Sequence, residues 1–257
     1  MEFISSLQNQ KIKDLVTLET KSRERRSRGV FVVEGRREIE RAAACGFDAV
    51  EVFCTDGDNV PSGISCPIYG VTGKVYGKIA YREGTEGIVA IMKEKGRMKP
   101  DISSDSLVLV LESVEKPGNL GAVLRTADAA GVDAVFICDP LTDLYNPNLI
   151  RASLGAVFSV RTVCCSSEEA YGMIKTAGLN VLTAQLQDSE LYYDADMTKG
   201  TALVFGTEDK GLTDFWRERS DGRIRIPMAG LMDSLNVSVS AAILCFEAVR
   251  QRKSEKK

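Results

Sequence analysis

Histidine is absent from the 257 residues of this chain. The absence excludes a Ser-His-Asp triad, a histidine general base and every metal site that uses an imidazole ligand. Any chemistry that the chain performs must therefore use arginine, lysine, carboxylate, amide, hydroxyl or thiol groups. A single tryptophan and an unremarkable share of charged residues (27%) are otherwise typical of a globular protein.

The C-x-x-C motif and long apolar runs are also missing. The seven cysteines form no C-x-x-C pair, so small buried side chains in a reducing compartment are expected rather than disulfides or a zinc site. No apolar stretch approaches the roughly 20 residues that span a bilayer. The N-terminus lacks the basic and apolar regions of a signal peptide. We therefore expect a cytoplasmic protein with no membrane partner and no metal.

A local cluster of positive charge stands out against a formal net charge of -3. Such a cluster can neutralise several phosphates of a nucleic acid, although a solvated helix face or loop explains it equally well. With a pI near 5.3, contact with nucleic acid would have to be local. The five candidate RNA-binding residues are Lys21, Arg23, Arg25, Arg26 and Arg28.

The first hundred residues predict a small α/β domain. Helical patterns and short buried strands alternate there, and a polar stretch without periodicity follows. We predict a domain at residues 1–95 and a linker at 96–106. The expected helices are 11–21 and 36–44, and the expected strands are 29–35, 49–54 and 87–92.

Residues 107–257 predict a larger α/β domain with a mainly parallel sheet. The run LVLVL at 107–111 is typical of a strand that is covered on both faces, and strands then alternate with helices. The further expected strands are 133–138, 179–184, 202–205 and 223–226, and the expected helices are 120–130, 168–177 and 236–252.

Three unusual loops follow strands of this sheet, at residues 112–131, 206–212 and 227–240. In open parallel sheets, ligands bind beyond the carboxyl ends of the strands. The three loops should therefore meet at one edge, and their convergence is stronger evidence for a site than any one of them.

The first loop contains Asn119 and, six residues later, Arg125. That spacing places them on different helical faces, so we expect Asn119 to act from the loop and Arg125 from the following helix. Asn119 could equally be a plain helix cap, and Arg125 could simply pair with Asp128.

The other two loops have similar alternatives. Glu208 is a carboxylate between two glycines, and its simplest interpretation is a solvated loop acid. Ser234 and Asn236 precede a long helix and could be its caps, or that helix N-terminus could hold a phosphate or a substrate oxygen. Because G-x-G-x-x-G and Walker A patterns are both missing, a nicotinamide-dependent oxidoreductase is a weak alternative.

Taken together, the loops resemble the three motifs of the SpoU (TrmH) family of RNA 2′-O-ribose methyltransferases, in the SPOUT superfamily. The matching segments are PGNLGAVLRTADAAG (117–131), LVFGTEDKGL (203–212) and IPMAGLMDSLNVSVSAAI (226–243), with NPNLIRASLGAVFSV (146–160) between them. The N-terminal segments ISSLQNQKIKDLVTL and VFVVEGRREIERA resemble the L30e-like substrate-binding domain that is often attached to this family.

The resemblance implies a SPOUT methyltransferase domain at 107–257 with a C-terminal trefoil knot, a homodimer, and S-adenosylmethionine as methyl donor. Matching positions imply that the donor lies near Gly206, Ile226 and Leu235, together with Ala184 and Met228. The implied active-site residues are Asn119, Arg125, Glu208, Ser234 and Asn236.

The implied reaction is methylation of an RNA ribose 2′-hydroxyl, with ribosomal RNA, 23S above all, as the favoured substrate. Arginine resists deprotonation, so a phosphate-binding role suits Arg125 better than proton abstraction. Ser234 and Asn236 would position the ribose, and Glu208 would hold the loop or a substrate group. Many relatives carry Asp or Asn where this chain has Lys116, which suggests a change in the RNA that is bound. The alternatives are a tRNA 2′-O-methyltransferase and a non-catalytic RNA-binding ribosome-assembly factor.

Overall fold

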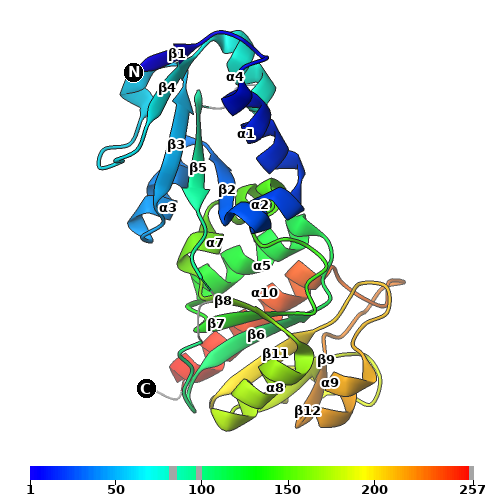
Figure 1. Ribbon diagram of the computed structural model, residues 1–257. Coiled ribbons are helices and arrows are strands. Elements are labelled where there is room, and N and C mark those ends of the chain that lie inside the picture. The colour runs from blue at the N-terminus through cyan, green and yellow to red at the C-terminus, as the bar shows by residue number, and fades with distance from the viewer. Residues whose placement is uncertain (81–85, 97–99, 255–257) are drawn as a thin grey trace. The chain divides into compact units, whose positions relative to one another are not determined.

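The computed structural model describes residues 1–80, 86–96 and 100–254, and the chain divides into two compact units (Figure 1). Unit 1 comprises Met1–Gly96 and Asp143–Ser159, and unit 2 comprises Arg97–Thr142 and Val160–Lys257. None of the described helices is both long and apolar enough to cross a lipid bilayer.

Unit 2 is built on a seven-stranded sheet in the order β10-β12-β9-β11-β6-β7-β8, in which every neighbouring pair is parallel. This confirms the mainly parallel α/β fold expected from the sequence. The strands are β6 (Leu107–Glu112), β7 (Ala134–Cys138), β8 (Thr162–Cys165), β9 (Asn180–Ala184), β10 (Glu190–Leu191), β11 (Thr201–Phe205) and β12 (Gly222–Arg225).

Helices cover both faces of this sheet, which is why β6 is apolar at consecutive positions. Side chains of alternate strand residues, such as Val108 and Val110, pack with the buried Trp216 on the face covered by α8 and α9. Helices α5 and α10 pack against each other on the opposite face (Figure 1). The helices are α5 (Pro117–Ala130), α8 (Ser167–Thr176), α9 (Asp214–Arg219) and α10 (Val237–Ser254).

Unit 1 contains a five-stranded mixed sheet in the order β1-β4-β3-β5-β2, in which β5 runs antiparallel to both neighbours. Helices α1 and α4 bury their apolar residues against one face of it. The strands are β1 (Glu2–Ile4), β2 (Val30–Glu34), β3 (Ala49–Cys54), β4 (Ile68–Val71) and β5 (Ile88–Lys93); the helices are α1 (Gln10–Thr20), α2 (Ser22–Arg28), α3 (Arg36–Ala44), α4 (Gly73–Ile79), and the short 3-10 turn Gly57–Asn59.

The segment Asp143–Ser159 belongs to unit 1, although it lies in the sequence between strands β7 and β8 of unit 2. It carries α6 (Pro147–Ser153) and α7 (Ala156–Ser159). Tyr145 stacks on Phe31, with ring centroids 4.2 Å apart, and Phe158 packs against Phe31 and Phe47. Four aromatic rings thus attach this segment to the unit 1 sheet.

The boundaries expected from the sequence differ from these units in that segment, since 143–159 falls inside the expected domain 107–257. The division into domains at 1–95 and 107–257 remains a prediction, and residues 97–99 of the expected linker lie outside the described residues. The trefoil knot also remains a prediction.

Candidate active site

The three unusual loops converge at the carboxyl edge of the unit 2 sheet, as the sequence indicated. One side chain from each loop enters a single hydrogen-bond network. Asn119 Nδ2 donates to Glu208 Oε1 at 2.8 Å, and Asn236 Nδ2 donates to the same oxygen at 2.6 Å. Asn236 Nδ2 also lies 3.2 Å from Asn119 Oδ1 and donates to it. Residues up to 117 positions apart in the chain are held within one cluster.

Asn236 both caps α10 and takes part in the network. Its Oδ1 accepts hydrogen bonds from the backbone N–H of Ser238 at 2.9 Å and from the Ser238 hydroxyl at 2.6 Å. Its amide nitrogen is directed to Glu208 and Asn119. Asn236 is therefore both a helix cap and a residue of the network. Both roles are possible because its amide has an acceptor oxygen and a nitrogen with two donor hydrogens.

Asn119 differs from the expectation that it acts from a loop or caps a helix. Helix α5 begins at Pro117, so Asn119 lies in its first turn, and the N-cap position is Lys116 without a side-chain cap. Proline is favoured at the first helical position, where its missing N–H has no partner to lose. The early start leaves the Asn119 side chain available for the network.

Lys116 forms an ion pair with Glu208 Oε2 at the edge of the network. Its hydrogen bond to the Glu208 carboxylate is the main cause that lowers the pKa of Glu208, and the amide of Asn119 lowers it further. The same hydrogen bond raises the pKa of Lys116. Glu208 is therefore an ionised acceptor at neutral pH, and it is a poor candidate for a proton donor.

A tight loop presents Glu208 to its partners. Thr207 and Gly211 exchange two backbone hydrogen bonds of 3.0 and 3.1 Å, which close the loop, and Gly211 has a positive φ of 68°. A Cβ on Gly206 would lie 2.2 Å from the Gly211 carbonyl carbon. Only glycine at position 206 leaves room for the backbone of Gly211 to pass this close, so any side chain there would clash with it.

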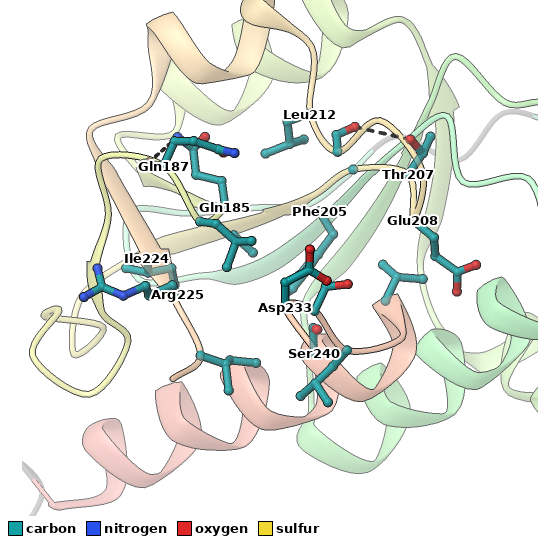
Figure 2. Close-up of a pocket in the computed structure, with 18 of the residues that line it drawn as sticks. Gln185, Gln187, Phe205, Thr207, Glu208, Leu212, Ile224, Arg225, Asp233 and Ser240 are labelled. Carbon is teal, nitrogen blue, oxygen red and sulfur yellow. Dashed lines mark hydrogen bonds between the residues drawn. The ribbon is translucent and has the colours of Figure 1, made fainter. Parts of the chain in front are cut away.

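A cavity of about 300 Å³, here called cavity 1, lies beside this loop. It is lined by the residues that follow β9, β11 and β12 and by the start of α10. Figure 2 shows Gln185, Phe205, Leu212 and Asp233 around it. All five positions expected near the cofactor line cavity 1, namely Ala184, Gly206, Ile226, Met228 and Leu235.

Two further residues of cavity 1 were missed by the sequence analysis. Oε1 of Gln185 and Nε of Arg217 are buried and have no hydrogen-bond partner among the described residues. Buried polar atoms are nearly always paired, so these two atoms are available to a polar partner in the cavity. No sequence signal distinguishes these two positions.

A second cavity of about 610 Å³, cavity 2, shares the wall 207–211 and Val237 with cavity 1. Lys116 and Asn119 line it, and Glu208 lines both cavities. Glu112 and Thr213 also line cavity 2, and the buried Glu112 accepts hydrogen bonds from the backbone N–H and the hydroxyl of Thr213, at 2.8 and 2.6 Å. This pair fixes the end of β6 to the N-cap residue of α9.

The remaining candidate residues of unit 2 lie apart from the network. Ser234 is exposed and lines cavity 1 only. Arg125 is exposed on α5 and lines neither cavity, and it makes no hydrogen bond or ion pair with any described residue.

Within unit 1, the basic cluster lies on helix α2 and its N-cap residue Lys21. The structure shows that one member of the cluster, Arg25, is not available to RNA. Arg25 is only 3% exposed, and its guanidinium pairs with Asp143 at 2.7 Å, so it is a structural residue rather than an RNA contact. The four exposed members of the cluster are Lys21, Arg23, Arg26 and Arg28.

Across the described residues, no group of three or more His, Cys, Asp or Glu side chains could hold a metal ion. The hydrogen-bond network itself consists of two amides, one carboxylate and one ammonium group, and three of its members, Lys116, Asn119 and Glu208, line the two adjoining cavities.

Residues 106–246 match the SpoU rRNA Methylase family, and residues 9–90 match an MRM3-like substrate binding domain. The chain belongs to the SpoU rRNA methylase family. The 23S rRNA (guanosine(2553)-2′-O)-methyltransferase RlmP of Bacillus subtilis is 32% identical over 252 residues, which cover 96% of this chain and 98% of the relative.

Other relatives of this SpoU methylase differ in substrate and in bound ligand. The tRNA (guanosine(18)-2′-O)-methyltransferase of Thermus thermophilus is 39% identical over 158 residues, covering 61% of this chain and 78% of the relative. The crystal structure of an AdoMet-bound rRNA methyltransferase from Sinorhizobium meliloti superposes with a TM-score of 0.89 at 28% identity, covering 97% of each chain.

Proposed function

We propose that this chain transfers a methyl group from S-adenosylmethionine to a ribose 2′-hydroxyl of RNA, with 23S ribosomal RNA as the favoured substrate. One observation carries the proposal: a network from all three family motifs spans the wall between two adjoining cavities. A methyl donor in one cavity and a nucleotide in the adjoining one would be positioned next to each other, and such positioning supplies much of the rate of a two-substrate reaction.

Cavity 1 suits the donor. Its volume is at the lower end of the range for small-molecule sites, and it offers one unpaired acceptor on Gln185 and one unpaired donor on Arg217. Gly206, Ile226 and Leu235 line its wall. When bound there, S-adenosylmethionine supplies an electrophilic methyl group on a sulfonium. The relative from Sinorhizobium meliloti was crystallised with this molecule.

Cavity 2 suits the target nucleotide. It has about twice the volume of cavity 1, and it contains the exposed ammonium group of Lys116. Asn119 has a second amide hydrogen that the network does not use, because only one hydrogen bond from its nitrogen is present. These two groups can donate to oxygens of a ribose or a phosphate.

Each network residue has a role that follows from its charge and geometry. Glu208 stays ionised and fixes the orientation of the two amides, so that Asn119 and Asn236 position the ribose. The 2′-hydroxyl must lose its proton as it attacks. Arg125, whose guanidinium resists deprotonation, would bind a phosphate of the target, and that phosphate would assist the proton loss.

RNA recognition is assigned to unit 1 and its exposed cations on α2. The match to a substrate binding domain over residues 9–90 supports this assignment. Ribosomal RNA is favoured because RlmP, which matches almost the whole chain, is a 23S rRNA methyltransferase. Transfer RNA is the second candidate, since a guanosine(18) tRNA methyltransferase matches 61% of the chain.

The same proposal includes a cytoplasmic homodimer with a trefoil knot between β11 and α10. Large apolar side chains are exposed close to the site: Leu231 and Met232 on the third loop, and Val239 and Phe246 on α10. Exposed apolar side chains of this number favour a second subunit. The seven cysteines are free thiols.

Incubation with methyl-labelled S-adenosylmethionine tests the proposal. Unmodified 23S rRNA, 16S rRNA and tRNA are supplied in separate reactions, and we expect label in 23S rRNA alone. Label in tRNA alone would move the assignment to the second candidate. Donor binding without transfer to any RNA, precursor particles included, would instead indicate a non-catalytic RNA-binding protein.

A further inference from the structure

Arg217 is a cationic residue that the proposed mechanism does not use, yet it lines cavity 1. It lies in the middle of the short helix α9, and its side chain passes beside the 207–211 loop. A Cβ built on Gly211 would lie 3.5 Å from Nη2 of Arg217, so the guanidinium lies against that glycine. The guanidinium is thus held at van der Waals distance from the 207–211 loop.

No carboxylate of the described residues lies within ion-pair distance of the Arg217 guanidinium. Its Nε is buried without a partner, and Arg217 forms no ion pair with any described residue. Its neighbour Arg219, by contrast, lies over the Phe215 ring at 4.5 Å and reaches Glu218 and the carbonyl of Phe215. A buried guanidinium nitrogen that lacks an acceptor is costly, and buried polar atoms are normally paired.

Gln185 has an unpaired hydrogen-bond acceptor in the same cavity, whereas Arg217 has an unpaired donor. The amide nitrogen of Gln185 donates to the carbonyl of Gln187 at 3.0 Å, which fixes the orientation of the amide and leaves Oε1 buried without a donor. A ligand that pairs both atoms carries an acceptor for Arg217 Nε and a hydrogen-bond donor for Gln185 Oε1. S-adenosylmethionine carries a carboxylate and two kinds of N–H group, whereas an RNA phosphate offers only acceptors.

We infer that Arg217 binds the carboxylate of the methyl donor and that Gln185 Oε1 accepts an N–H of the same molecule. The inference rests on the proposed function for the identity of the donor. Guanidinium groups match carboxylates with two parallel hydrogen bonds, and an arginine in this cavity selects a ligand that retains its amino-acid carboxylate. Arg217 is thus a determinant of donor specificity, in addition to the residues implied by the three motifs.

A binding cycle tests this without any RNA. The affinities of S-adenosylmethionine and of decarboxylated S-adenosylmethionine are measured by calorimetry on the full chain and on Arg217→Met. We expect the native chain to prefer the carboxylated donor by about 10- to 100-fold, the range for hydrogen bonds to charged groups. Arg217→Met should lose that preference by weakening the carboxylated donor only, with affinity for the decarboxylated one unchanged within about threefold.

Two variants serve as controls. Arg219→Met removes the exposed arginine at the end of α9, which lines neither cavity, and it should leave both affinities unchanged. Arg217→Lys keeps the charge and loses the planar fork, so it should retain part of the preference. Unchanged melting temperatures of all variants would show that they are folded.

The outcomes separate this inference from the proposed function. If the native chain binds S-adenosylmethionine but Arg217→Met weakens both donors equally, or neither, the role of Arg217 is wrong and the proposed function stands. If the folded native chain binds neither donor, the donor assignment of the proposed function fails, and the inference fails with it.

Discussion

At the residue scale, the site depends on side chains that can donate and accept at once. The Asn236 amide accepts from Ser238 at one end and donates to Glu208 at the other. Neither serine nor aspartate could do both, because serine is too short to reproduce both contacts and aspartate has no donor when ionised. The position is therefore constrained by α10 and by the network together.

Asn236→Ser separates these two constraints. Serine is as good an N-cap as asparagine, so the free energy of unfolding should change by less than about 0.5 kcal/mol, whereas Asn236→Ala should cost about 1 kcal/mol through loss of the cap. Both variants lose the donor to Glu208, so both should lose methyl transfer by about 100-fold. Thermal unfolding and initial rates provide the two readouts. Full activity in Asn236→Ser would show that the amide nitrogen is not needed.

Lys116→Met tests the electrostatic part of the network. Removing the cation removes the main cause of the low Glu208 pKa, so that pKa should rise towards its ordinary value of about 4.3. Because the Glu208 pKa is lowered in the folded chain, the ionised carboxylate stabilises the network at every pH above its ordinary pKa. That stabilisation is lost as the pH falls through the folded-state pKa. The acid limb of the rate profile should therefore move to higher pH in this variant.

Carbon-13 titration of the Glu208 carboxyl gives the pKa directly. Lys175→Met is the matched control, since Lys175 pairs with Asp221 at 2.9 Å away from both cavities. An unchanged Glu208 pKa in Lys116→Met would contradict the proposed coupling.

Sequence reasoning found the network but not all of the cavity. Asn119, Glu208 and Asn236 follow strand ends in the three loops, and that position is what brings them together. Arg217 was missed because a lone arginine in a short helix has no pattern that indicates a cavity. Arg25 was misassigned because its partner, Asp143, lies 118 residues away.

At the element scale, the buried strands of unit 2 were predictable and the helix starts were less so. Runs such as LVLVL identify a covered strand by composition alone. Strand β8 was missed because TVCC is short and lacks a distinctive pattern, and α5 begins three residues before the predicted Leu120. Such boundaries depend on tertiary contacts, here those of Lys116 and Asn119 with Glu208.

Gly206→Ala tests whether the 207–211 loop depends on the close packing of Gly206 against the backbone of Gly211. The new Cβ would meet backbone atoms of Gly211 and Leu212 at 2.2 to 2.5 Å, and backbone cannot rotate away as a side chain can. We expect a loss of about 1–3 kcal/mol in the free energy of unfolding and at least about tenfold weaker donor binding.

The control for this substitution is Gly172→Ala on α8, where a Cβ meets nothing within 4 Å. Alanine should stabilise that helix by about 0.5–1 kcal/mol. Denaturant unfolding and calorimetry check both variants, and native donor affinity in Gly206→Ala would show that the loop adapts.

At the scale of the whole molecule, the chain passes between the two units three times, because Asp143–Ser159 belongs to unit 1 while its flanks belong to unit 2. The buried Arg25–Asp143 pair and the aromatic cluster hold this segment in unit 1. The compositions of 1–95 and 107–257 indicated two domains, but a segment shared in this way has no local sequence signal.

Arginine substitutions in α2 should divide into two classes. Arg25→Ala leaves Asp143 buried without its partner, so it should cost about 3–5 kcal/mol in the free energy of unfolding. The triple variant Arg23→Ala, Arg26→Ala, Arg28→Ala removes exposed charges, and its stability should be nearly unchanged.

The triple variant should instead bind RNA more weakly. A plot of the logarithm of affinity against the logarithm of salt concentration has a negative slope. The magnitude of that slope should decrease by about 0.7–0.9 for each phosphate contact that is lost. Filter binding over a salt series measures it. Native RNA affinity and slope in the triple variant would rule out α2 as an RNA contact.

The position of the transferred methyl group tests the central claim most directly. A 2′-O-methyl group blocks alkaline cleavage of the adjoining phosphodiester, whereas a base methyl group does not. Ribosomal RNA labelled by this chain is hydrolysed in alkali and its products are separated by size. We expect all the label in alkali-resistant dinucleotides, and label in mononucleotides would contradict ribose 2′-O-methylation.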